Sequence, residues 1–110
     1  MASTSGEPPL VPLSLPSQEQ WVLHRVLSDM LDRSRRSPGT TPPPHPDVYR
    51  TVRKVEAGSL LFTVSELRIA REALVASREA GRAADGERRR VAEVVERIDD
   101  ALARAGTVAP

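Results

Sequence analysis

Proline decides where this chain of 110 residues can form helices. Nine of its ten prolines lie within residues 1–46, in one group at residues 8–16 and another at residues 38–46. Proline has no amide hydrogen to donate and its ring clashes with the preceding turn, so helix interiors exclude it. Long helices are therefore confined to the stretch between the two groups and to the residues after 46. We expect one small domain.

The composition excludes several kinds of chemistry. The chain has no cysteine, which rules out disulfides, thiolate zinc sites and thiol catalysis. No apolar run approaches the ~18 residues that a membrane-spanning helix needs, and the first residues lack the basic and apolar regions of a secretory signal. We therefore expect a cytoplasmic protein with no membrane-spanning segment.

The charge of the chain is almost balanced, with 16 basic and 15 acidic residues and a net charge of +1. A nucleic-acid-binding protein usually presents a basic surface that attracts phosphates. Any such surface here has to come from local clustering. All basic residues but Lys54 are arginine, whose planar guanidinium pairs well with carboxylates.

Residues 1–16 are small, polar and interrupted by proline. Such a segment buries too little apolar surface to offset the entropy of ordering, so we expect a disordered or loosely docked tail. One set of apolar residues in it can lie along the body as an extended strip: Leu10, Val11, Leu13 and Leu15.

The first helix is expected to run from Ser17 to about Arg33. Ser17 and Gln20 have the spacing of a capping box, in which the two side chains bond the first backbone amides of a helix. Apolar residues recur at helical spacing and predict a buried stripe. This stripe contains Leu23, Val26, Leu27 and Met30, with Leu31 at its edge.

Residues 37–46 form a proline-rich connector, which we interpret as a stiff spacer between two helices. Asp47 is expected to cap a short second helix, Val48–Ala57, which Gly58 ends in the left-handed conformation. The residues of this helix predicted to face inward are Val48, Val52 and Val55.

Residues 59–62 form an apolar link that is too short to pair as a strand. A second capping box, Thr63 with Glu66, then opens a third helix that extends to about residue 80. The stripe of this helix predicted to face the core is Leu67, Ala70 and Leu74.

A fourth helix is expected from about Asp85 to Gly106, with a regular heptad-like apolar seam. The seam residues are Val91, Val94, Val95, Ile98, Ala101, Leu102 and Ala105. The predicted fold class is therefore all-α, a small four-helix bundle-like domain at residues 17–106. Disordered segments are expected on either side, at residues 1–16 and 107–110.

The sequence contains no readable catalytic or metal site. The only histidines, His24 and His45, have no carboxylate at a recognisable metal-binding spacing. No serine or threonine is placed beside a base as a nucleophile requires, and no glycine-rich phosphate loop occurs. We therefore expect no enzyme, no cofactor and no small-molecule substrate.

Trp21 lies nearly opposite the predicted stripe of its helix. Three interpretations are open. The N-terminal tail can cover the ring, the ring can anchor an interface, or the ring can simply be half exposed. Tryptophan is enriched among interface anchors.

The apolar core is small for the length of the chain, which favours a shared face with a second copy. The leading prediction is a non-enzymatic interaction or regulatory module that binds a partner protein or itself. Its candidate interface is Trp21, His24, Arg25 and Ser28.

Two basic clusters support an alternative, a nucleic-acid-associated accessory or transcriptional regulatory protein. One cluster lines a face of the second helix, and the other opens the fourth helix, where positive charge opposes the helix dipole. The candidate nucleic-acid contacts are Arg50, Arg53, Lys54, Arg88, Arg89 and Arg90.

Four segments of the chain read QEQWVLH, VEAG, FTVSEL and RIDDAL, at residues 18–24, 55–58, 62–67 and 97–102. In this order they resemble a group of small haloarchaeal proteins of unknown function. The resemblance covers roughly residues 17–104. It implies a compact helical body and no particular activity.

Overall fold

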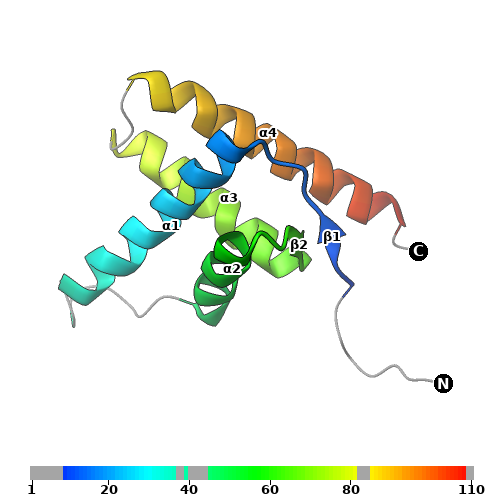
Figure 1. The fold of residues 1–110 in the computed structure, drawn as a ribbon, viewed down its shortest axis with the longest axis horizontal. Coiled ribbons are helices and arrows are strands. Elements are labelled where there is room, and N and C mark those ends of the chain that lie inside the picture. The colour runs from blue at the N-terminus through cyan, green and yellow to red at the C-terminus, as the bar shows by residue number, and fades with distance from the viewer. Residues whose placement is uncertain (1–8, 37–38, 40–44, 82–84, 109–110) are drawn as a thin grey trace.

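Helices make up most of the computed structural model, which describes residues 9–36, 39, 45–81 and 85–108 (Figure 1). Within these ranges four helices and two very short strands follow one another along the chain. They are β1 (Val11–Pro12), α1 (Ser17–Arg36), α2 (Pro46–Ala57), β2 (Leu61–Phe62), α3 (Val64–Glu79) and α4 (Asp85–Val108). This architecture confirms the predicted all-α class. None of the described helices is both long and apolar enough to cross a membrane.

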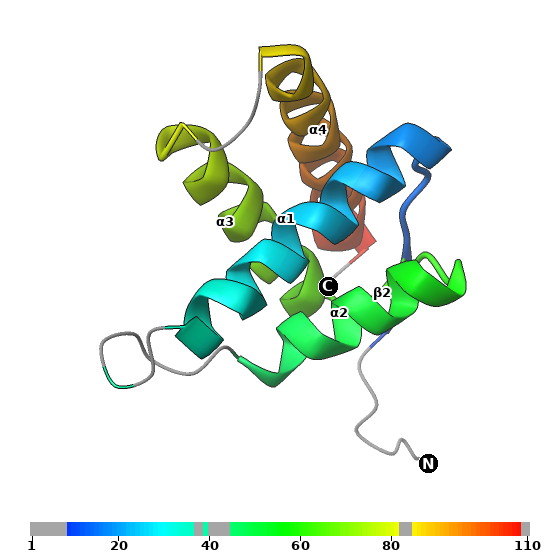
Figure 2. The same cartoon turned by 60° about the vertical axis from the view of Figure 1, so that its left-hand side comes forward.

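The helices α1 and α3 form the centre of the domain, and each packs against the other three helices. The helices α2 and α4 flank this central pair on opposite sides (Figure 2). In the same view α1 and α2 run alongside each other in opposite directions.

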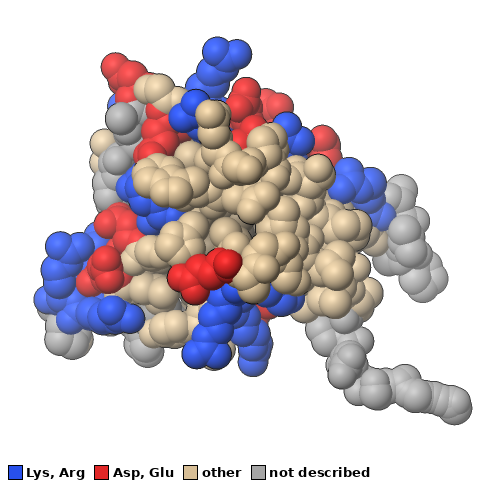
Figure 3. All heavy atoms as spheres, in the orientation of Figure 1, with Lys and Arg blue, Asp and Glu red and all other residues tan. Residues whose placement is uncertain are grey.

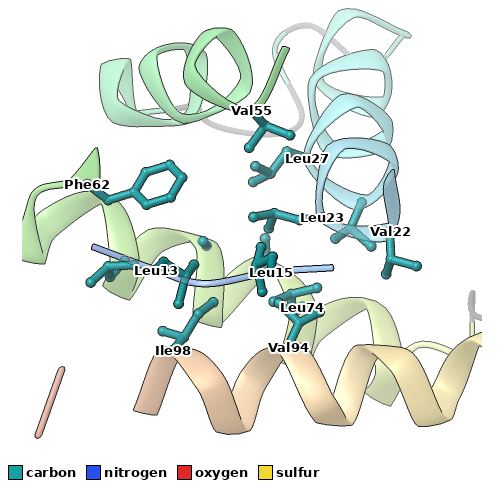
Figure 4. Packing of buried hydrophobic residues seen from close by; sticks show 14 of the residues in the cluster. Leu13, Leu15, Val22, Leu23, Leu27, Val55, Phe62, Leu74, Val94 and Ile98 are labelled. Carbon is teal, nitrogen blue, oxygen red and sulfur yellow. The ribbon is translucent and has the colours of Figure 1, made fainter. Parts of the chain in front are cut away.

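The core is built from aliphatic side chains of all four helices. The predicted seam of α4 is buried from residue 91 to residue 101, and the stripes of the other helices meet it. Figure 4 shows Leu23, Leu74 and Val94 converging from α1, α3 and α4. The predicted core residues that are only partly buried are Met30, Leu102 and Ala105.

A two-stranded antiparallel sheet joins the chain before α1 to the link before α3. Val11 lies opposite Phe62, and the amide of Leu13 donates to the carbonyl of Leu60 at 3.0 Å. The prediction that residues 59–62 are too short to pair is therefore wrong. Two paired residues suffice here because the inward side chains of both strands, Val11 and Phe62, are buried in the common core.

Residues 9–16 also bury apolar surface along the body. Leu13 is 3% and Leu15 is 6% exposed, and both point toward α3 and α4 (Figure 4). These residues follow the docked alternative, the predicted extended strip, because alternating side chains let an extended segment bury one face. Leu10 is the exception in this strip, at 53% exposed. Residues 1–8 lie outside the described part of the chain.

The start of α3 has the predicted capping box. Thr63 Oγ1 accepts from the Glu66 amide at 3.0 Å, and Glu66 Oε1 accepts from the Thr63 amide at 2.8 Å. The start of α2 differs from the prediction, because the cap is His45 and not Asp47. His45 Nδ1 accepts from the Asp47 amide at 3.1 Å, and Pro46 takes the first helical position, where its missing amide hydrogen costs nothing.

The start of α1 also differs from the predicted Ser17–Gln20 box. The carbonyl of Pro16 accepts from the amides of Glu19 and Gln20, both at 2.9 Å. Gln20 Nε2 donates instead to the carbonyl of Leu15 at 2.8 Å. The Gln20 side chain therefore ties the helix to the buried segment that precedes it.

The helix ends follow the predictions at some positions and extend past them at others. Gly58 ends α2 with a φ of 73°, in the predicted left-handed conformation. The helix α1 continues past the predicted end at Arg33 to Arg36, and α4 continues past Gly106 to Val108. The last two residues and most of the proline-rich connector lie outside the described residues.

Candidate functional site

Trp21 on α1 is the most exposed of the large apolar side chains in the described ranges, at 61%. On the other side of the same helix, Leu23 is fully buried. The chain segment before α1 does not cover Trp21, because Leu13 and Leu15 point into the core (Figure 4). Coverage by residues 9–16 is therefore excluded, and two interpretations remain, an interface anchor and simple exposure.

Trp21 borders a shallow hollow of about 360 Å³ between α1 and the last turn of α2. The hollow is lined by Ser17, Gln20, Trp21, His24, Val55 and Glu56. At its edge His24 Nε2 lies 2.8 Å from Glu56 Oε2, which joins the two helices. The hollow therefore combines one aromatic ring, one carboxylate and one imidazole, and no lysine or arginine lines it.

The other two predicted interface residues do not line this hollow. Arg25 Nε donates to Glu87 Oε2 at 2.9 Å and Arg25 Nη2 donates to Glu87 Oε1, which ties α1 to α4. Ser28 is half-buried, one turn further along α1. The structure thus brings together Trp21 and His24 and separates them from Arg25 and Ser28.

A second exposed apolar area lies on the outer side of the two-stranded sheet. Leu10 is 53% and Leu61 is 45% exposed. Leu61 pairs with Pro12, and because side chains alternate along a strand, Leu10, Pro12 and Leu61 share one face. Figure 3 shows a broad uncharged area on this side of the molecule, with charged side chains above it over α4 and below it near α2.

Carboxylates hold two of the three predicted basic residues on α2. Arg50 Nη1 lies 2.5 Å from Asp47 Oδ1, and Lys54 Nζ lies 2.7 Å from Glu66 Oε1. Together with Arg53, which is exposed, they line a hollow of about 580 Å³ at the start of α3. Because two of the three charges are compensated locally, this cluster presents only a small net positive charge.

Asp47 also accepts a hydrogen bond from Ser65 Oγ at 2.6 Å, which links α2 to the first turn of α3. This hydrogen bond lowers the pKa of Asp47, helped by Arg50 and His45 and opposed by burial of the carboxyl. The sequence indicates that Asp47 lies at a helix start, and it gives no sign of a role for Ser65. A serine in the first turn of a helix is too common to be diagnostic.

Arg88, Arg89 and Arg90 are exposed in the first turns of α4. Arg89 Nε lies 3.7 Å from Glu93 Oε2 on the same helix. Because α4 and α2 lie on opposite sides of the central helix pair (Figure 2), the structure does not join the two predicted basic clusters into one surface.

An ion pair with a buried carboxylate, which the sequence did not indicate, ties α1 to α4. Glu19 is 6% exposed, and its Oε1 lies 2.6 Å from Arg97 Nε. The contact is an electrostatic pair and not an aligned hydrogen bond. Arg97 Nη1 also lies 3.4 Å from the carbonyl of Ser14, so this pair also helps to hold the segment before α1.

Several acidic and basic side chains in the described ranges form ion pairs between two helices. A further example is Arg71 Nε, which donates to Asp99 Oδ1 at 2.6 Å, a contact that raises the pKa of Arg71. No group of three or more His, Asp or Glu side chains within these ranges is arranged to hold a metal ion. The pairs between helices help to fix how the helices cross, and the others lie within one helix or at its start.

Fold and surface together define a small helical domain with an exposed aromatic side chain beside a polar hollow. The model of DUF7853, a family of unknown function, matches residues 13–99, and the chain belongs to this family. Neither a curated protein nor a solved structure matches the chain. The family confirms the resemblance to uncharacterised proteins, and the haloarchaeal grouping stays a prediction.

Proposed function

We propose that this protein is a non-enzymatic interaction module that binds another protein, or a second copy of itself, through the surface around Trp21. The observation that carries this proposal is the 61% exposure of Trp21. Tryptophan is enriched among the residues that contribute most to protein interfaces. The neighbouring hollow supplies polar groups that can orient a partner.

The size of the exposed ring supports the proposal. A tryptophan side chain has about 250 Å² of surface, so 61% exposure leaves on the order of 150 Å² in water. Covering that area is worth on the order of 3 kcal/mol before the costs of association. By contrast, the ring of Phe62 is 1% exposed, so the fold buries its phenylalanine and leaves its tryptophan outside.

The test is the association behaviour of Trp21→Ala, with Tyr49→Ala as the matched control. Tyr49 is an aromatic residue of α2 that is 44% exposed and lies outside the hollow. We expect Trp21→Ala to weaken self-association, measured by sedimentation velocity, or partner binding, measured by pull-down from the native cell. The expected loss is about 1 kcal/mol or more. Equal behaviour of the two variants would contradict the proposal.

A second candidate function is nucleic-acid association through Arg88, Arg89 and Arg90. The observation in its favour is that all three side chains are exposed at the start of α4, where positive charge is unfavourable next to the helix dipole. We expect binding to duplex DNA that weakens steeply as salt rises. The absence of a mobility shift at low salt would exclude this candidate.

A further inference from the structure

We infer that the hollow between α1 and α2 receives a cationic side chain, arginine or lysine, from the protein partner, with Trp21 and Glu56 as the recognising groups. This inference rests on the proposed function, because it names the chemistry of the partner that the Trp21 surface takes. It assigns Glu56, which the sequence analysis did not single out.

Trp21 supplies the first recognising group. The face of an indole carries negative charge from its π electrons and attracts ammonium and guanidinium groups, and tryptophan is the strongest aromatic residue in this role. A guanidinium can also stack flat on the ring. Both interactions need an exposed indole ring, and Trp21 is 61% exposed at the edge of the hollow.

Glu56 supplies the second recognising group from the facing helix. Its side chain is 57% exposed, and its Oε2 lies 2.8 Å from His24 Nε2. This contact positions the carboxylate at the hollow. A carboxylate accepts several hydrogen bonds, so an incoming N–H donor can bond Glu56 while His24 stays in place.

Glu56 is the one acidic residue in the lining of the hollow, and its carboxylate complements a cation. None of the lysines and arginines that the structure describes lines the hollow. Arg25, the nearest arginine along α1, is turned to Glu87 on α4. Arg53, three residues before Glu56, lines the other hollow at the start of α3.

The openness of the hollow, and not its volume, favours one side chain of a partner over an independent ligand. Sites for drug-sized molecules span roughly 300–1,000 Å³ and enclose most of the ligand. This hollow measures about 360 Å³ and is shallow and open to solvent. A long arginine or lysine side chain can lie across it while the rest of the partner contacts the surface around Trp21.

The experiment is an NMR amide titration of the full chain with two short peptides, one carrying a central arginine and the other a neutral citrulline. Citrulline keeps the shape of arginine and removes its charge. We expect the arginine peptide to bind roughly 3- to 30-fold more tightly, from the combined attraction of the ring and the carboxylate. The shifted amides should include those of Gln20, His24 and Glu56.

Three variants locate the effect. Glu56→Gln and Trp21→Leu should each reduce the preference for arginine by about two- to fivefold. Glu96→Gln, which changes an exposed carboxylate on α4, should leave it unchanged. Equal binding of the two peptides, or a preference that survives both hollow variants, would overturn the inference.

The titration and the association test of Trp21→Ala together separate this inference from the proposed function. If Trp21→Ala abolishes association while both peptides bind alike, the interaction surface stands and its cationic specificity is wrong. If Trp21→Ala leaves association unchanged, the proposed function fails and this inference fails with it.

Discussion

Leu13→Ala tests whether the segment before α1 contributes to the stability of the domain. Leu13 is 3% exposed and points into the core among residues of α3 and α4 (Figure 4). Replacing a buried leucine with alanine lowers the free energy of unfolding by about 2–5 kcal/mol, and the loss is larger where the surrounding structure cannot relax. The segment of Leu13 is held by a two-residue ladder and can shift to fill part of the space. We therefore expect a loss in the lower half of this range, about 2–3 kcal/mol.

Urea denaturation followed by the fluorescence of Trp21, the only tryptophan, measures this loss. For a domain of this size the slope of the unfolding free energy is about 1–2 kcal/mol per molar urea, so the midpoint should fall by roughly 1–3 M. Leu10→Ala is the control, because Leu10 is on the same segment but 53% exposed. It should change stability by less than about 0.5 kcal/mol. If the two variants unfold alike, the docking of residues 9–16 contributes nothing and the reasoning is refuted.

Three further predictions concern helix ends. Because the pKa of Asp47 is lowered from 3.8 in the folded protein, its ionised form stabilises the fold above that pH, and this contribution is lost as the pH falls through the lowered value. Asp47→Asn should therefore cost about 1–3 kcal/mol at pH 7, and thermal unfolding should show the gap to wild type closing below about pH 4; a gap of constant size down to pH 2 would contradict this. Thr63→Ala removes the acceptor of the Glu66 amide and should cost about 0.5–2 kcal/mol in urea, whereas Thr63→Ser should retain most of the stability. A β-carbon added by Gly58→Ala would meet no atom within 4 Å, but alanine would have to adopt a φ of 73°. This variant should therefore lose about 1 kcal/mol of unfolding free energy in the same urea assay. An unchanged stability would show that the end of α2 relaxes.

The features predicted correctly from the sequence depend on residues close together in the chain. The apolar seam of α4 repeats with helical spacing over residues 91–101 and is buried as predicted. The Thr63–Glu66 capping box spans three residues and forms as predicted. In both cases the interacting residues lie within a few helical turns of one another, so the local sequence is enough to predict the feature.

The features that the sequence did not predict depend on how distant elements meet. The ladder pairs Val11 with Phe62, and an ion pair joins the buried Glu19 to Arg97. Neither contact has a local signal, because two residues make a weak strand pattern and an acidic residue in a first helical turn is ordinary. The contact between His24 and Glu56 is of the same kind, since it depends on the alignment of α1 beside α2.

The separation of Trp21 from Arg25 has a related cause. Both were predicted to share one interface because they are one helical turn apart. The crossing of α4 over α1 gives Arg25 a partly buried partner in Glu87, while Trp21 stays on the α2 side. A single helix can therefore divide its apparent outer face between an internal ion pair and an open surface.

Site-specific photo-crosslinking in the native cell tests the interaction surface most directly. A photoreactive phenylalanine analogue placed at Trp21 keeps a large aromatic side chain at the hollow, and the same analogue at Glu96 on α4 serves as the control. We predict one defined adduct from position 21, either with a second copy of the chain or with a single partner protein, and none of that mass from position 96. Identical adduct patterns at the two positions, or no adduct from position 21, would contradict the assignment of this surface to binding.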